Sequence, residues 1–208
     1  MRSEVLIAVG PDRTPRVEGR GAIAVRHTGI DTVHLVSAAA TPLGGDVIRV
    51  RVVVEPGARL NIRSVAAAVA LPGGATVESH ADWEIEVAGA LHLDPEPTIV
   101  AAAARHITST RLSLTAGASV HLRERVQIGR TAEREGFWSG SLHADADGRP
   151  LLRHRVELGR GSLADDAIAA PLACVSELHY PRTDVTTAGV ALELAGGGCL
   201  ATWQGQRL

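Results

Sequence analysis

The sequence predicts a mostly β protein: antiparallel strands in stacked hairpins or irregular β-helix-like layers, with one or two short helices. Three observations support this fold class. Residues 119–128 alternate between polar and apolar side chains, as a strand buried on one face does. Asp147-Gly148 is a strong hairpin dipeptide between two further alternating stretches. Glycine-alanine pairs open strands at irregular intervals, namely Gly57-Ala58, Gly74-Ala75, Gly89-Ala90 and Gly117-Ala118.

The individual elements follow from this alternation and from the turn residues between them. The expected strands are residues 3–9, 21–27, 32–38, 48–54, 58–65, 76–87, 90–93, 105–114, 119–128, 137–146, 151–158, 185–194 and 199–203. Residues 58–65 are expected to return as the hairpin partner of residues 48–54. The alanine-rich residues 65–71 fit either a buried strand or one helical turn. Residues 165–178 are the one expected helix, which Pro171 must break or kink.

The composition excludes several classes of function. The 208 residues are expected to form a single domain, residues 1–208. A balance of 21 basic and 23 acidic residues argues against nucleic acid or an anionic membrane as the main partner. Every basic residue is arginine, which rules out a P-loop lysine or a Schiff-base lysine. No C-x-x-C, H-E-x-x-H or G-x-S-x-G motif is present, so we expect no enzymatic activity.

Compartment is inferred from the cysteines and from the apolar segments. Cys174 and Cys199 are too few for a disulfide framework and fit a reducing compartment. No segment resembles a signal peptide, and no apolar run reaches the roughly 18 residues of a membrane span. We therefore expect a cytoplasmic protein.

Glu124 is the strongest candidate for a functional residue, because it interrupts the apolar face of residues 119–128. Burying an unpaired carboxylate costs several kcal/mol, so this side chain needs a partner. Two interpretations stay open. Glu124 either borders an interior polar channel or a partner contact, or it is a structural acid paired with an arginine.

His154 interrupts the apolar face of residues 151–158 in the same way. A lone histidine on such a face is most often a core imidazole with one hydrogen bond. If it lies close to Glu124, the two side chains become a candidate metal or proton site.

Two short runs offer potential ligands for Ni²⁺ or Zn²⁺. These runs are His143-x-Asp145-x-Asp147 and His92-x-Asp94. The first leads directly into the Asp147-Gly148 turn, so a solvated sheet edge is the preferred interpretation there.

Two glycine turns complete the candidate positions. Gly44-Gly45-Asp46 offers backbone N–H groups to an anion, but no helix follows it, so a tight turn is the preferred interpretation. Gly129-Arg130 ends the strand 119–128 and leads into a charged loop that contains Glu135. We expect these residues to serve a structural or interaction role.

Four blocks of this chain, taken together and in order, resemble the urease accessory protein UreD family, also called UreH. The blocks are Gly44-Gly45-Asp46, Pro56-Gly57-Ala58-Arg59-Leu60, Leu93-Asp94-Pro95-Glu96-Pro97-Thr98-Ile99, and Gly117-Ala118 through Glu124 and Gly129-Arg130 to Glu135-Gly136. The likeness covers most of residues 40–203. It departs after Arg59, where the family usually runs to a lysine and an aromatic residue and this chain has Ser64-Val65-Ala66-Ala67.

The resemblance implies a non-catalytic scaffold with a β-rich fold and a pair of helices. Such a scaffold binds apo-urease and recruits the accessory proteins UreF and UreG. Nickel then passes toward the urease active site through a polar passage, with no tightly bound cofactor. In this chain Glu124 and His154 are the expected weak nickel contacts along that passage. A route for transit should hold the ion with oxygen ligands and water, because a tight histidine cage would retain it.

Two alternatives remain open on the sequence alone. The first is a β-rich metalloenzyme of the cupin or β-helix type that uses His143, Asp145, Asp147 or His154. The second is a degenerate binding module without a metal role.

Overall fold

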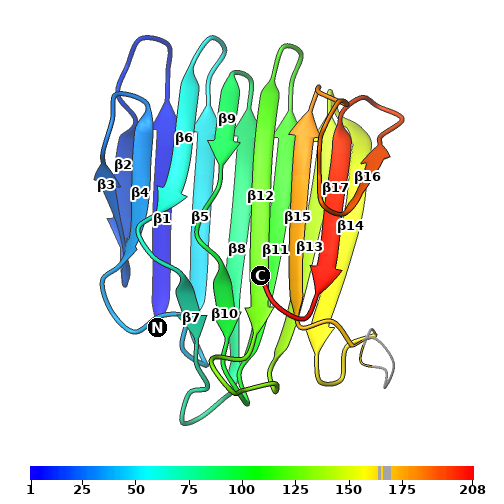
Figure 1. Cartoon of the computed structure of the whole chain (residues 1–208). Coiled ribbons are helices and arrows are strands. Elements are labelled where there is room, and N and C mark those ends of the chain that lie inside the picture. The colour runs from blue at the N-terminus through cyan, green and yellow to red at the C-terminus, as the bar shows by residue number, and fades with distance from the viewer. Residues whose placement is uncertain (164, 166–169) are drawn as a thin grey trace.

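The computed structural model describes residues 1–163, 165 and 170–208, and this part of the chain consists of seventeen β-strands joined by loops, without a helix. The strands form two sheets that face each other (Figure 1). Within the described residues there is accordingly no helix long and apolar enough to cross a membrane. The mostly β class is confirmed, and the expected short helices are not found there.

Sheet A contains seven strands in the order β14-β13-β11-β8-β5-β1-β2. Their bounds are β1 Arg2–Val9, β2 Arg16–Arg20, β5 Val47–Val54, β8 Glu78–Val87, β11 Arg105–Leu114, β13 Phe137–Ala146 and β14 Arg149–Gly159.

Sheet B runs in the order β16-β17-β15-β12-β9-β6-β4-β3, with the short strand β10 beside β12 and the short strand β7 beside β10. The bounds are β3 Ile23–His27, β4 Thr32–Ser37, β6 Arg59–Ser64, β7 Ala68–Ala70, β9 Ala90–Leu93, β10 Thr98–Val100, β12 Ser119–Ile128, β15 Ala173–Tyr180, β16 Val190–Glu193 and β17 Cys199–Gly205.

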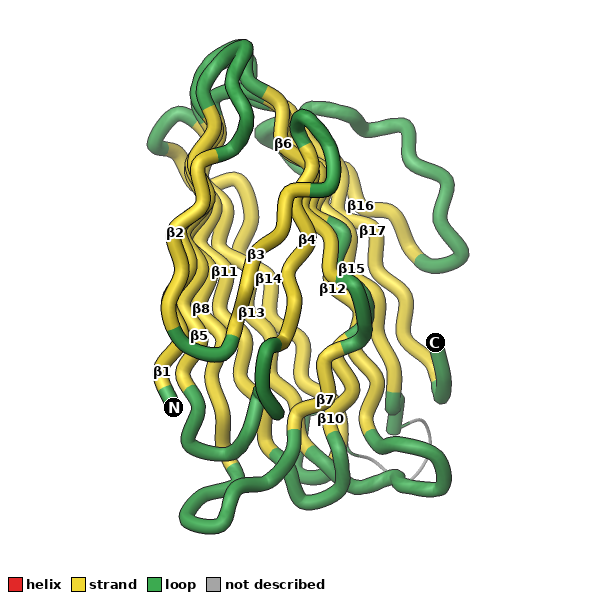
Figure 2. The backbone as a smooth tube through the Cα atoms, turned by 90° about the vertical axis from the view of Figure 1, so that its left-hand side faces the viewer, coloured by secondary structure: helices red, strands yellow, loops and turns green. Residues whose placement is uncertain are grey.

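In the middle of the chain the backbone passes repeatedly from one sheet to the other and back, so that it forms a coil whose two sides are the two sheets (Figure 2). Strand β5 of sheet A is followed by β6 of sheet B, β8 by β9, and β11 by β12. Successive coils therefore stack in parallel, β5 on β8 and β8 on β11 in sheet A, and β6 on β9 and β9 on β12 in sheet B. Parallel neighbours need a crossover connection, and each coil supplies one through the opposite sheet.

The predicted architecture of stacked antiparallel hairpins is therefore wrong for this region. Residues 59–64 do not return beside residues 47–54, because β6 lies in the other sheet and β5 pairs in parallel with β1 and β8. Both arrangements bury one face of each strand, so alternation alone does not distinguish them. A hairpin does form at Asp147-Gly148, where both residues have positive φ and β13 pairs antiparallel with β14.

Three of the four glycine-alanine pairs mark the same turn of successive coils, the turn from sheet A to sheet B. The turns stack on one another through backbone hydrogen bonds: Ala90 N donates to Ala58 O at 2.9 Å, and Ser119 N donates to Gly89 O at 2.8 Å. The weak repeat in the sequence is thus the period of the coil. The Gly74-Ala75 pair differs, because it lies in the loop before β8.

The expected helix at residues 165–178 is wrong where the structure describes it. Residues 164 and 166–169 lie outside the described part of the chain, and residues 173–178 belong to strand β15. Here Cys174, Ser176 and Leu178 alternate with outward side chains, so a period of two prevails over the alanine content.

The core lies between the sheets and is almost entirely aliphatic. Its larger cluster contains fully buried residues such as Ile7, Leu60 and Ile85, and a smaller cluster surrounds Trp138 at the end of the sheets that contains β7 and β10. With few aromatic side chains, the fold depends on close packing of Val, Leu, Ile and Ala between the layers.

Candidate functional site

A cavity of about 250 Å³ lies between the two sheets, where the aliphatic core gives way to polar side chains. Thr108 and His106 of β11 line it from sheet A, and Leu122 and Glu124 of β12 line it from sheet B. It borders an interruption of sheet B that we call the gap. At the gap, residues 65–67 connect β6 to β7 and residues 94–97 connect β9 to β10 without strand structure. Prolines 95 and 97 cannot donate ladder hydrogen bonds, which explains why the sheet is interrupted there.

Glu124 projects into this cavity from the inner face of β12. Its one described hydrogen bond comes from the Thr108 hydroxyl, which donates to Oε1 at 2.9 Å. Among the described residues no arginine forms an ion pair with it, so the structural interpretation as an arginine-paired acid does not describe this carboxylate. Burial raises the pKa of Glu124 to about 7, and the Thr108 hydrogen bond only partly opposes this shift.

His106 is a second polar side chain at the cavity wall. It is only 2% exposed, and its Nδ1 lies 2.9 Å from the Ser79 hydroxyl. Burial, together with the nearby His80, lowers the pKa of His106 to about 4, so the ring is neutral at physiological pH. The cavity therefore combines a neutral imidazole, hydroxyl groups and the carboxylate of Glu124, and the exposed Glu96 also lines it.

An arginine closes part of the gap in sheet B above this cavity. Arg125 Nη2 donates to Asp94 Oδ1 at 3.0 Å and to Pro95 O at 2.7 Å. Val65, Ala66 and Ala67 line the same opening with small apolar side chains. Arg123 and Glu96 also belong to the lining, so access to Glu124 leads past charged side chains as well as small residues.

His154 and Glu124 do not touch each other in the structure. The Nε2 atom of His154 lies 3.4 Å from the Ser176 hydroxyl, and Ser176 is the register partner of Glu124 between β12 and β15. Burial lowers the pKa of His154. One serine therefore separates the two expected nickel contacts.

The run His143, Asp145 and Asp147 forms no common site. His143 and Asp147 are exposed, Asp145 pairs with Arg153 at 2.5 Å, and Asp147 occupies the hairpin turn. This placement agrees with a solvated edge and leaves the alternative of a metalloenzyme at these residues without a gathered ligand set.

The Gly44-Gly45-Asp46 turn uses its own hydrogen-bonding groups internally. Gly44 N donates to Leu71 O at 2.9 Å and Gly45 N to Glu78 O at 2.7 Å, so neither faces an anion. The Asp46 carboxylate accepts hydrogen bonds from the Thr41 hydroxyl and from Leu43 N, both at 2.9 Å. A tight structural turn fits these contacts.

Glu133 fixes the loop that follows β12. Arg130 pairs with Glu133, which also accepts from Ala102 N at 3.0 Å. The hydrogen bonds from Arg130 lower the pKa of Glu133 to about 2. Glu135 is exposed, with Arg160 at 3.8 Å, and Gly129 adopts a φ of 80° where the strand ends.

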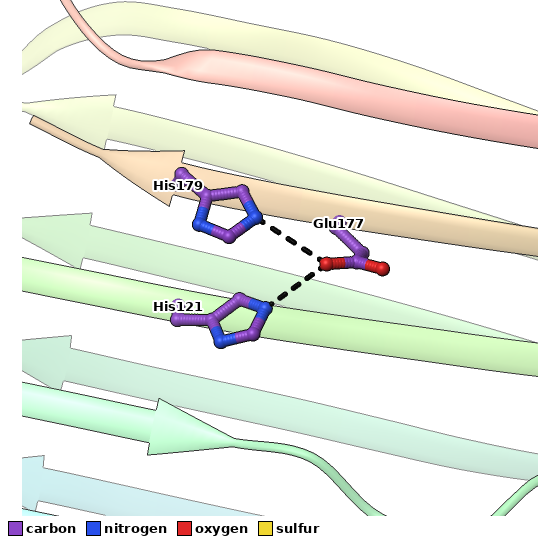
Figure 3. Close-up of side chains that lie close together, drawn as sticks. All are labelled: His121, Glu177 and His179. Atoms are coloured by element: carbon purple, nitrogen blue, oxygen red, sulfur yellow. Dashed lines mark hydrogen bonds and ion pairs between the residues drawn. The ribbon is translucent and has the colours of Figure 1, made fainter. Parts of the chain in front are cut away.

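A histidine ladder crosses the outer face of sheet B, on the side of β12 opposite Glu124. We use this name for His92 of β9, His121 of β12 and His179 of β15, which occupy matching register positions. The ring centroids of His92 and His121 lie 4.8 Å apart, and those of His121 and His179 lie 4.2 Å apart, both pairs stacked. Glu177 of β15 lies beside the last two rings (Figure 3).

Sequence reasoning missed the ladder and His106 for different reasons. The alternation of residues 105–114 places His106 and Thr108 on the inward face. Two polar residues on a face that is otherwise apolar indicate a polar site inside the protein, and this could be recognised from the sequence. The ladder depends on which strands become neighbours, and a coil that pairs β9 with β12 is not visible in local spacing.

The fold and this site define a class: a two-sheet coiled β protein with an ionisable carboxylate in an internal cavity. Comparison with known families assigns it further. Residues 16–198 match the model of the UreD urease accessory protein family, and the chain belongs to that family.

Named relatives agree with this assignment. The chain is 36% identical to urease accessory protein UreD 1 of Saccharopolyspora erythraea over 88% of this chain and 75% of the relative. It is 44% identical to urease accessory protein UreD of Frankia alni over 76% of this chain and 61% of the relative. It is 37% identical to the UreD of Streptomyces avermitilis over 74% of this chain and 63% of the relative. The chain thus spans between about three fifths and three quarters of these proteins.

Proposed function

We propose that this protein is a urease maturation scaffold that binds apo-urease together with the accessory proteins UreF and UreG and assists nickel insertion, without catalysing a reaction itself. The single observation that supports this most is the cavity around Glu124, in a member of the UreD urease accessory protein family.

The chemistry of the cavity suits passage of a cation more than its retention. Glu124 is the one carboxylate within hydrogen-bonding reach of Thr108, and the neighbouring ligands are oxygens or a hydrogen-bonded imidazole. A volume of about 250 Å³ leaves room for an ion that keeps much of its water shell. One carboxylate with water ligands binds a divalent ion weakly, as a transit position requires.

Replacement of Glu124 by alanine is expected to lower urease activation strongly, because it removes the carboxylate that the inner face of β12 presents to the cavity. The matched control is Glu84→Ala, which removes an exposed carboxylate from β8. Urease activity is measured after co-expression of each variant with the urease subunits and the other accessory proteins. Equal activation by the two variants, with both folded, would remove Glu124 from the passage.

The scaffold role has a separate test that does not depend on nickel. Tagged protein is expected to retain urease subunits in a pull-down when UreF and UreG are co-expressed, and the Glu124→Ala variant should retain them equally well because its change is internal. Failure of the wild-type protein to associate would contradict the scaffold proposal.

A further inference from the structure

We propose that His121, Glu177 and His179 form a second cation site, on the outer face of sheet B, that takes one borderline transition-metal ion such as Ni²⁺ or Zn²⁺. Two imidazole nitrogens and one carboxylate oxygen form the donor set, with the remaining positions open to water. The proposal goes beyond the maturation role, because it concerns a surface site that the internal cavity does not need.

The distances between the donor atoms support this assignment. Glu177 Oε2 lies 3.1 Å from His121 Nε2 and 3.3 Å from His179 Nε2, and all three donors lie within 4.8 Å of one another. Bonds of about 2.0–2.1 Å from a Zn²⁺ ion to nitrogen and oxygen, at tetrahedral angles, place two donors roughly 3.3 Å apart. Each nitrogen therefore already lies about one edge length of a coordination polyhedron from the oxygen. Ion binding requires that the two rings tilt together and that each Nε2 gives up the proton it now directs at the carboxylate, with the neutral ring protonated at Nδ1 instead.

The backbone fixes this geometry. His121 and His179 are directly opposite each other in the β12–β15 register, and Glu177 precedes His179 by two residues on the same face of β15. Figure 3 shows both rings directing a nitrogen toward the same carboxylate oxygen. Because the three residues lie on paired strands and not on loops, the site is largely formed before an ion arrives.

A neighbouring arginine orients the carboxylate. Arg123 Nε lies 3.0 Å from Glu177 Oε1, which leaves Oε2 to the two imidazoles. Burial disfavours ionisation of Glu177, but the hydrogen bond from His121 and the charge of Arg123 outweigh it, and the pKa of Glu177 is lowered. The guanidinium also offsets part of the attraction for a cation, so the bound ion should exchange readily.

The donors remain reachable from solvent. The side chains of His121, Glu177 and His179 are 32%, 21% and 15% exposed, so an ion can enter from the outer face while the rings stay held by stacking. His92 extends the ladder on the far side of His121, but it lies outside the group of three donors. It therefore supplies a control that alters the ladder without removing a ligand.

Calorimetric titration of the purified chain with Ni²⁺ and Zn²⁺ tests the proposal. We expect one ion bound per chain, no comparable binding of Mg²⁺, and affinity lowered about tenfold or more in His121→Ala and in His179→Ala. His92→Ala should bind as the wild type does. Circular dichroism establishes that each variant is folded, and the ligand-field spectrum of the Co²⁺-loaded wild type gives a reading that needs no variant.

Three results would overturn the proposal. One is a wild-type chain that binds no equivalent of Ni²⁺ or Zn²⁺. The second is unchanged affinity in the His121→Ala His179→Ala double variant. The third is loss of binding in Glu124→Gln with retention in both histidine variants, which would place the ion in the cavity. None of these results bears on the association with urease subunits, so the maturation role stands or falls separately.

Discussion

The Gly89→Ala variant is expected to lose more than about 3 kcal/mol of unfolding free energy, because the turn from β8 to β9 has no room for a methyl group. A Cβ atom at Gly89 would lie 2.3 Å from Ala58 O and 2.5 Å from Glu55 O. Both obstacles are backbone atoms of the preceding coil, and Ala58 O also accepts the stacking hydrogen bond from Ala90 N. The clash can be relieved only by separating two coils. Urea unfolding followed by circular dichroism measures the loss.

Gly74→Ala is the matched control, since it makes the same change in another glycine-alanine pair. A Cβ atom there would meet nothing within 4 Å, and Gly74 does not have a positive φ. We expect the unfolding free energy to change by no more than about 0.5 kcal/mol. Similar losses in both variants would show that the effect comes from the glycine backbone in general and not from the stacked turn.

The faces of the individual strands could be predicted from the sequence because burial of one face imposes a period of two. Residues 119–128 show this fully: the predicted inward residues Val120 and Ile128 are buried, and Glu124 borders the cavity as the interior acid. The hairpin at Asp147-Gly148 could be predicted for a similar reason, because a two-residue turn with positive φ at both positions favours this dipeptide.

The pairing of the strands could not be predicted in the same way. A hairpin and a coil place the same residues inward, and the choice between them depends on how whole strands stack. The glycine-alanine pairs carried the signal for a coil, but their irregular spacing reflects loops of unequal length between β6 and β8 and between β9 and β11. The histidine ladder and the gap in sheet B follow from that stacking, so they became visible only with the fold.

The charge on Glu124 is expected to destabilise the folded protein at alkaline pH. Its folded-state pKa of about 7 lies above the ordinary value of 4.5, so the folded protein holds a proton that the unfolded chain has already released. The contribution of this group to stability is therefore complete at low pH and decreases as pH rises through 7. Wild-type stability should fall accordingly between pH 5 and pH 8.

Glu124→Gln removes this charge and keeps the shape of the side chain. The amide oxygen can still accept the hydrogen bond from Thr108. The unfolding free energy of the variant minus that of the wild type should increase by roughly 2 kcal/mol from pH 5 to pH 8. Urea unfolding at both pH values measures the gain. Titration of His106 and His154 is common to both proteins and cancels in the difference.

Glu84→Gln shows whether the gain comes from burial, because it makes the same chemical change at an exposed position on β8. Its stability should follow the wild-type pH profile within about 0.5 kcal/mol. A Glu124→Gln profile parallel to that of the wild type would mean that solvent fills the cavity well enough to keep the carboxylate ionised in the folded state. A carboxylate with the ordinary pKa of 4.5 would already be ionised at neutral pH when a divalent ion arrives, whereas one with a pKa of about 7 must release a proton to bind the ion at or below neutrality. The same measurement therefore decides whether the proposed passage of nickel through this cavity would be coupled to a proton.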